Sequence, residues 1–423
     1  LYKIKNPDLF RMRCISNYSL NLSISKIRLQ SWIVAFMFFA TVVDLGGGIY
    51  LKYLSYAFSL IMLIFIKPKV GDTNGNFIIT TLFFLGPLFS IFIGFINGGD
   101  LSLAITNITP FIPAILCFIL INDDNIAVAL NSFLSSIYLM SGITIGIYLL
   151  FTLYPSIIDS VSNFLTEKSF GMFGNKQLFI TFFPGVYFKS TLFYNFAFIY
   201  YLYTAKYMRV CVIFTGILLS FSKSASAVAF IVLLLFLFRI DKIETKRLLY
   251  NKFKLFTIFL LLIIIISGIH YLEDLWLDIW NYFFLALSGR AETSTVRILH
   301  LKSLFDLFSE HPFYLIWGQG VGTTFFTKGF NAYVDNIEID HFNTIRKFGL
   351  IWASLFYIFV LYICVKCYRI RAIRVLGFSF LLTFILVGTN PLLISPLFLM
   401  LVVLMYKYSY YYKNYEYGLS ANL

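Results

Sequence analysis

The stretch GLIWASLFYIFVLYICV (Gly349–Val365) decides how this 423-residue chain folds, because it is a continuous apolar run without a charged residue. An apolar run of about 20 residues matches the roughly 30 Å hydrocarbon thickness of a bilayer. The rest of the chain repeats this composition, with 60% hydrophobic residues, 13% charged residues and a mean hydropathy of +0.83. The sequence therefore predicts an all-α polytopic membrane protein, with residues 1–423 forming a single integral membrane domain.

Outward from this run, further apolar stretches predict about twelve transmembrane helices. A large outer loop, 271–348, separates the ninth span from the tenth, and a second outer loop covers 153–188. The expected spans are 29–46, 49–66, 77–96, 101–121, 127–152, 189–205, 208–222, 224–238, 255–270, 349–365, 375–389 and 392–407.

The distribution of Lys and Arg predicts which side each loop occupies. Cytoplasmic loops retain positive charge during insertion, and placing the N-terminus inside puts most of the 33 basic residues on inner segments. With an even number of spans, both termini are then cytoplasmic. The net charge of +13 follows from this topology and suits anionic membrane lipids, so no nucleic-acid partner is expected.

The large outer loop contains two arginines seven residues apart, Arg290 and Arg297 in GRAETSTVR. On a helix this spacing is two turns and places both side chains on one face. Paired guanidinium groups suit a diphosphate, whose oxygens they bind bidentately. The alternative is that they are surface arginines contacting lipid phosphates or water. The amphipathic stretch that follows, 296–308, is suited to lying along the membrane surface and ends before Pro312.

The end of this loop, IEIDHFNTIRKFG (Ile337–Gly349), contains the acidic candidates. Read as a helix, it places Glu338 on the same stripe as the apolar Ile345, and Asp340 on the opposite side. A charged carboxylate on a packed face destabilises the fold unless it is paired or has a function. We therefore predict Glu338 as the general base and a solvated or paired Asp340. His341, near the same stripe, is the alternative base or an interfacial hydrogen-bonding residue.

Two lysines and a glycine turn complete the set of candidates. Lys189 opens the predicted sixth span, and Lys223 lies in the SFSKS hairpin between the seventh and eighth. A lysine at a span end is most often a snorkelling anchor, but the serines around Lys223 favour a polar pocket. The GQGVG turn at Gly318–Gly322 is either a corner or a phosphate cradle, and it lacks the strand-then-helix context of a nucleotide site.

Taken together, these features resemble the O-antigen polymerase (Wzy) family, which is related to the O-antigen ligases. The resemblance is carried by the SKS turn at Lys223, an arginine before an amphipathic helix, the GQGVG turn, and Glu338 eleven residues before Gly349-Leu350. Relatives often have arginine where this chain has Lys223. Ligases usually have a histidine in place of Glu338, and a shifted alignment would put Asp340-His341 at that position.

The resemblance implies a GT-C-like architecture and a glycosyltransferase on the periplasmic face of the bacterial inner membrane. Its donor and acceptor are undecaprenyl-diphosphate-linked glycans, polymerised into O-antigen or a related surface polysaccharide. It assigns catalysis to Glu338 or His341 and diphosphate binding to the basic residues. Because the outer loops lack a clustered carboxylate pair, we expect no metal and no cofactor. Whether a polysaccharide chain-length regulator binds is left open. The diphosphate-binding candidates are Arg290, Arg297, Lys189 and Lys223.

Two other functions are compatible with the same sequence. An O-antigen ligase would use the same donor but transfer the glycan to lipid A-core. A transporter or flippase of lipid-linked sugars would place charged residues inside several spans and have little mass outside the membrane. Here the polar residues concentrate in one outer loop, which favours an enzyme.

Overall fold

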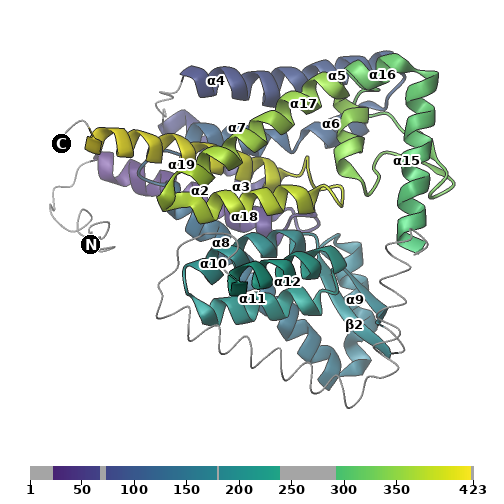
Figure 1. Cartoon of the computed structure of the whole chain (residues 1–423), viewed down its shortest axis with the longest axis horizontal. Coiled ribbons are helices and arrows are strands. Elements are labelled where there is room, and N and C mark those ends of the chain that lie inside the picture. The colour runs from purple at the N-terminus through teal and green to yellow at the C-terminus, as the bar shows by residue number, and fades with distance from the viewer. Residues whose placement is uncertain (1–21, 67–72, 179–180, 239–291, 421–423) are drawn as a thin grey trace.

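The computed structural model describes residues 22–66, 73–178, 181–238 and 292–420 (Figure 1). Within these ranges the chain is predominantly helical. Four helical segments are long and apolar enough to cross a membrane: Gly75–Ile96, Leu101–Leu120, Ile126–Leu153 and Asp340–Arg369. Arg28–Val43, Leu51–Phe65, Tyr207–Leu219 and Lys223–Phe238 are shorter apolar helices. This is the make-up of an all-α membrane protein.

Each predicted span within the described ranges falls on a helix or on consecutive helices, and 255–270 lies outside the described residues. The helices are α2 (Leu22–Val43), α3 (Leu51–Ile66), α4 (Thr73–Ile79), α5 (Gly86–Ile96), α6 (Leu101–Ile108), α7 (Phe111–Leu120), α8 (Ile126–Leu153), α9 (Ile158–Glu167), α10 (Tyr194–Tyr203), α11 (Tyr207–Leu219), α12 (Lys223–Phe238), α15 (Glu292–Glu310), α16 (Pro312–Trp317), α17 (Asp340–Arg369), α18 (Arg374–Val387) and α19 (Pro396–Ser420).

The predicted outer loops also contain two short antiparallel hairpins that the sequence analysis did not foresee. In the first, β1 (Gly171–Leu178) pairs with β2 (Thr181–Phe188). In the second, β3 (Phe325–Thr327) pairs with β4 (Ala332–Val334). Figure 1 places α9, β2, α15 and α16 toward the same end of the helix bundle. The described parts of the two outer loops therefore lie toward one end of the bundle.

The centre of the bundle is α19, whose residues Leu397–Met405 are all fully buried. A helix that is apolar on every side is stable only where neighbours cover every side. α2, α7, α8, α17 and α18 supply that cover. Helices farther out expose large apolar side chains, among them Phe77 and Phe95, as a lipid-facing surface would.

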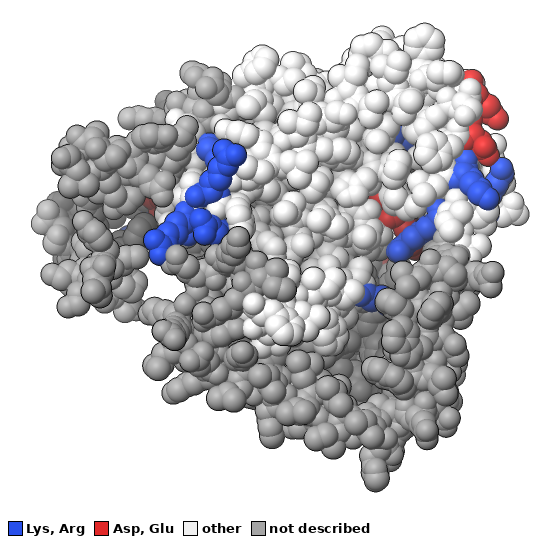
Figure 2. All heavy atoms as spheres, viewed as in Figure 1, with Lys and Arg blue, Asp and Glu red and all other residues white. Residues whose placement is uncertain are grey.

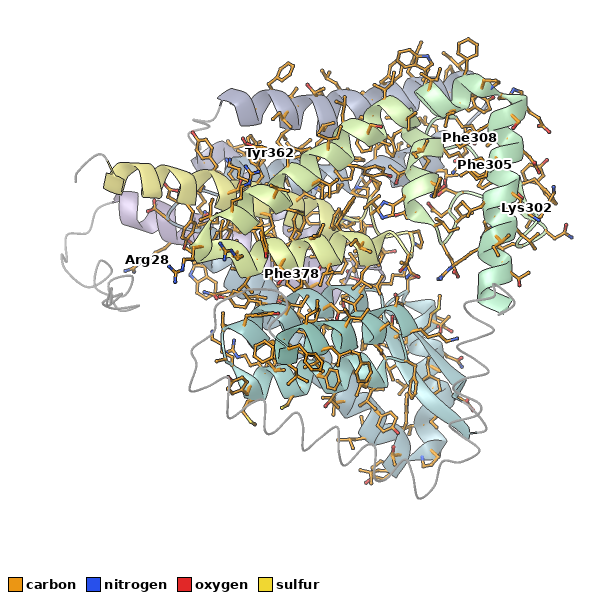
Figure 3. The ribbon with its side chains drawn as sticks, viewed as in Figure 1. Arg28, Lys302, Phe305, Phe308, Tyr362 and Phe378 are labelled. Atoms are coloured by element: carbon orange, nitrogen blue, oxygen red, sulfur yellow. The ribbon has the colours of Figure 1, made fainter. Side chains whose placement is uncertain are left out.

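The two ends of the bundle differ in their charges. α2 begins and α19 ends at the end opposite α15 (Figure 1), and Figure 3 shows Arg28 at that end and Lys302 on α15. Figure 2 shows one group of basic side chains toward the first end and a second group, mixed with acidic ones, at the other. The basic junction between α17 and α18 contains Lys366, Arg369, Arg371 and Arg374.

The amphipathic stretch predicted before Pro312 is helical and forms most of α15, which lies across the end of the bundle (Figure 1). Its apolar face, however, does not form a free membrane-binding surface. Leu304 and Phe308 are buried against Phe325 and Ile337, while Phe305 remains half exposed. β3 and the segment before α17 thus cover part of the face that the sequence suggests could lie along the membrane surface.

A glycine-rich corner attaches the outer segment to the bundle. Gly318, Gly320 and Gly322 all have positive φ, and a Cβ on Gly320 would lie 2.1 Å from the backbone nitrogen of Gly94 in α5. Only glycine allows both this backbone conformation and this close approach. The GQGVG turn is therefore a packed corner.

A break in α17 completes this attachment. At Gly349, φ is 81° and ψ is 161°, which interrupts the helix. The freed carbonyl of Arg346 accepts from the backbone N–H of Gln319 at 2.6 Å, and that of Lys347 accepts from Ser90 Oγ at 2.8 Å. The first turns of α17 are thus fixed between the glycine corner and α5.

Candidate functional site

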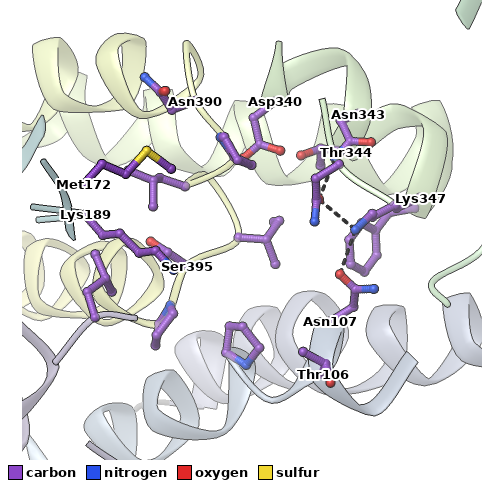
Figure 4. A pocket seen from close by; sticks show the side chains of 18 of the residues that line it. Thr106, Asn107, Met172, Lys189, Asp340, Asn343, Thr344, Lys347, Asn390 and Ser395 are labelled. Atoms are coloured by element: carbon purple, nitrogen blue, oxygen red, sulfur yellow. Dashed lines mark hydrogen bonds between the residues drawn. The ribbon is translucent and has the colours of Figure 1, made fainter. Parts of the chain in front are cut away.

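A cavity of about 430 Å³ lies between α6, the start of α17, the turn after β2 and the segment joining α18 to α19 (Figure 4). This volume is in the range of small-molecule sites, which are mostly apolar with a few convergent polar groups. Its apolar walls include several proline and leucine residues. Its polar side chains are Thr106, Asn107, Lys189, Asn336, Asp340, Asn343, Thr344, Lys347, Asn390 and Ser395, together with the partly polar Tyr187.

Lys347 is the cation of the cavity wall nearest α6, and its ammonium is fully satisfied. Nζ donates to Asp335 Oδ1 at 2.8 Å, to Asn107 Oδ1 at 2.7 Å and to Asn336 Oδ1 at 2.9 Å (Figure 4). Three acceptors match the three protons that a lysine can donate. Asn343 Nδ2 also donates to Asn336 Oδ1, at 3.0 Å. This wall is therefore rigid and its charge is balanced.

Arg346 stands behind that wall and is completely buried. Its guanidinium donates to Asn343 Oδ1 at 3.1 Å and to Gln319 Oε1 at 2.7 Å, and it stacks over the Phe325 ring at 4.7 Å. It also donates to the backbone carbonyls of Thr323 and Asp335. A buried charge is tolerated only with such full pairing. Arg346 thus joins the glycine corner to α17 and positions Asn343.

Lys189 is the second cation of the cavity, and it differs from Lys347 in lacking a partner. Among the described residues it makes no hydrogen bond and no ion pair. The carboxylate of Asp44 lies near enough to interact with its charge. Asp44 is itself engaged, because it accepts the backbone N–H of Leu51 at 2.8 Å. Lys189 can therefore bind an anion in the cavity.

Asp340 is buried more deeply than the sequence analysis expects. It lies on the same side as Lys347 and away from Glu338, as expected, but its side chain is buried and lines the cavity. Its Oδ2 accepts the backbone N–H of Leu393 at 2.6 Å. The physical reason is that α6 and the segment between α18 and α19, both distant in sequence, pack around this side of α17. Glu338 precedes α17, so a helical projection does not apply to it.

Glu338 lies at the edge of the cavity and is paired. Arg297 Nε donates to Glu338 Oε2 at 2.9 Å, and the two side chains are 41% and 38% exposed. Tyr187 connects this pair to the cavity: burial raises the pKa of its phenol to about 12, and the negative charge of Glu338 adds to that shift. The structure thus brings Arg297 and Glu338 together, a contact that the sequence analysis did not anticipate.

Two other predicted site residues, His341 and Lys223, do not line the cavity in the described structure. The ring of His341 packs against Tyr357 and Phe384, with centroids at 5.4 and 5.1 Å, and His341 is not among the residues that line the cavity. Lys223 begins α12, is exposed and does not line the cavity either. Arg290 lies outside the described residues.

The sequence analysis missed several polar residues of the cavity. Asn107 had a readable signal, since it is an amide within the apolar run predicted as the fourth span, and polar groups at membrane depth are often functional. Asn343 and Asn390 had a weaker signal, because they flank spans where polar residues are common. For Asp340 no local signal existed, since its environment comes from Leu393, 53 residues away.

Searches of known protein families, of curated proteins and of solved structures found no match to this chain.

Proposed function

We propose that this protein is a glycosyltransferase that polymerises undecaprenyl-diphosphate-linked oligosaccharide repeat units into O-antigen or a related surface polysaccharide. The observation that carries the proposal is the polar cavity at the end of an apolar helix bundle, where Lys189 makes no hydrogen bond or ion pair with the described residues. A polar cavity at this position suits a substrate with a lipid tail in the bilayer and a sugar head outside it. The resemblance to the Wzy family supplies the reaction.

The chemistry requires positive charge at the leaving group. Cleavage of a sugar–diphosphate bond leaves negative charge on the diphosphate, and a fixed cation stabilises that charge without a metal. Lys189 lines the cavity, and Arg297 is held by Glu338, whose charge acts on the cavity residue Tyr187. The roles that the resemblance implies for Arg290 and Lys223 stay predictions. For the acceptor proton the sequence predicts Glu338 or His341, neither of which lines the cavity.

The proposed setting is the bacterial inner membrane, with about twelve spans in a GT-C-like arrangement and both termini cytoplasmic. The basic α17–α18 junction would then face the cytoplasm, and α15 with the cavity would face the periplasm. The separation of these two groups of charges to opposite ends of the bundle supports this orientation. Donor, acceptor and surrounding lipids are the proposed partners, and neither a metal nor a cofactor is needed.

The test is elongation by the purified protein in lipid nanodiscs containing EDTA. The substrate is the undecaprenyl-diphosphate-linked repeat unit extracted from host cells that lack this protein, and the product is read as a ladder of longer glycans. A ladder from the wild-type protein supports polymerisation. Absence of a ladder would contradict it, and transfer only onto added lipid A-core would assign the ligase function instead.

A matched pair of lysine variants locates the site. Lys189→Met should lower elongation at least a hundredfold, or about 3 kcal/mol of transition-state stabilisation. Lys302→Met, on the exposed side of α15, removes the same charge far from the cavity wall and should stay close to wild type. Equal activity of the two variants would show that the reaction does not depend on Lys189, and the cavity would no longer be the proposed site.

A further inference from the structure

The cavity contains one carboxylate, and its placement bears on the step that the proposed function leaves open. Asp340 is the only acidic residue among those that line the described cavity. Its side chain stands on the wall formed by the first turn of α17 and the segment that joins α18 to α19, and Lys189 stands on another wall of the same cavity (Figure 4). An acid and a cation therefore share a space large enough for a sugar.

The surroundings of Asp340 also fix its orientation. The N–H of Leu393 holds Oδ2, and Asn390 and Ser395 from the same segment line the cavity beside it. Amide and hydroxyl groups of this kind bind sugar hydroxyls through hydrogen bonds. A general base has to be held within hydrogen-bond reach of the proton that it removes, and a side chain clamped on a cavity wall meets that condition.

Glu338 does not meet this condition. Its carboxylate is bonded to Arg297, its side chain is 38% exposed, and it is not among the residues that line the cavity. It lies between two cavity residues in the sequence, Asn336 and Asp340, but the chain turns its side chain toward α15. The pair that it forms joins α15 to the segment before α17, and a glutamine at this position would keep an oxygen for Arg297 Nε.

We propose that Asp340 is the catalytic carboxylate that accepts the proton of the acceptor sugar. This inference rests on the proposed function. The O–H bond of the acceptor breaks and its proton passes to Asp340, while the oxygen forms a bond to the anomeric carbon of the donor. The bond between that carbon and the diphosphate oxygen breaks, and its electron pair leaves with undecaprenyl diphosphate, whose charge Lys189 stabilises. Asp340 releases the proton to water when the products leave.

The decisive variants are Asp340→Asn and Glu338→Gln, measured in the same elongation assay. Asparagine retains an oxygen for the Leu393 N–H and nearly the same shape, but it cannot take a proton. We expect at least a hundredfold loss of elongation for Asp340→Asn, with retention of labelled donor on the nanodiscs unchanged. Glu338→Gln should stay within a few-fold of wild type. Wild-type elongation by Asp340→Asn, or abolished elongation in a folded Glu338→Gln, would overturn the assignment.

A second measurement covers the case in which Asp340→Asn does not fold. Elongation by a protein with a carboxylate base falls on the acidic side of its pH profile, and Asp340→Glu should move that acidic limb while Glu338→Gln leaves it in place. An acidic limb that moves only in the Glu338 variant would overturn the proposal. A wild-type protein without elongation activity would instead contradict the proposed function, so the two failures are distinguishable.

Discussion

Two ion pairs anchor the segment before and at the start of α17, and they have almost the same length in very different surroundings. Lys347 and Asp335 meet at 2.8 Å with side chains that are 6% and 16% exposed. Arg297 and Glu338 meet at 2.9 Å, about two fifths exposed on both sides. Solvent screens the second pair, whereas the first is held in a low dielectric with every proton of the lysine satisfied. The distance between the charged atoms therefore does not show which pair contributes more to the stability of the protein.

The largest expected effect comes from breaking the buried pair. Lys347→Met should lower the free energy of unfolding by about 3 kcal/mol or more, because Asp335 and the amide oxygens of Asn107 and Asn336 would lose a shared cation. Thermal unfolding in one detergent measures the change. The control is Lys328→Met, since Lys328 forms a pair with Asp306 that is equally short at 2.8 Å but 56% exposed on both sides. Similar losses in both variants would contradict the role of burial.

A smaller effect is expected at the glycine corner that supports the buried region. Gly320→Ala should lower the free energy of unfolding by about 1–3 kcal/mol, or displace the corner from α5. The reason is that φ is 93° at this position and a Cβ would lie 2.1 Å from Gly94 N. Gly98→Ala is the matched control, because its φ of 74° carries similar strain but nothing lies within 4 Å of its Cβ. If Gly98→Ala destabilised the protein equally, backbone strain and not packing on α5 would explain the glycine.

The smallest effect on stability is expected at the exposed pair. Arg297→Ala should change the free energy of unfolding by less than about 1 kcal/mol. If Arg297 contacts the diphosphate as proposed, its elongation activity should nevertheless fall a hundredfold or more. Unfolding and elongation are measured on the same preparation. Normal elongation together with a small stability change would make Arg297 a surface residue of α15.

The contrast between these two regions also shows which features of the structure could be predicted from the sequence. Apolar runs are a local property, and each described run predicted as a span coincides with helix. The hairpins were missed for a local reason as well. β2 contains Pro184 and Gly185, which normally count against a strand, and β3 and β4 are only three residues long.

Part of the candidate site could be predicted from the sequence. Arg297, Glu338 and Lys189 were selected from their residue type and position. The structure places Lys189 in the cavity lining and joins Arg297 and Glu338 in an ion pair outside that lining. Asp340 shares a side of α17 with Lys347 as expected, but that side faces the cavity and not solvent, while Glu338 precedes α17 and pairs with Arg297. No local pattern could reveal that Leu393 would bind Asp340.

The cavity has a consequence for how the protein is made. Its walls come from Leu45, near the start of the described chain, through Asn107 and Lys189 to Pro396 at the first residue of α19. The last wall therefore exists only once the ribosome has synthesised the chain as far as Pro396. A nascent chain that stops before Asn390 lacks the wall between α18 and α19, so the cavity described above cannot form in it.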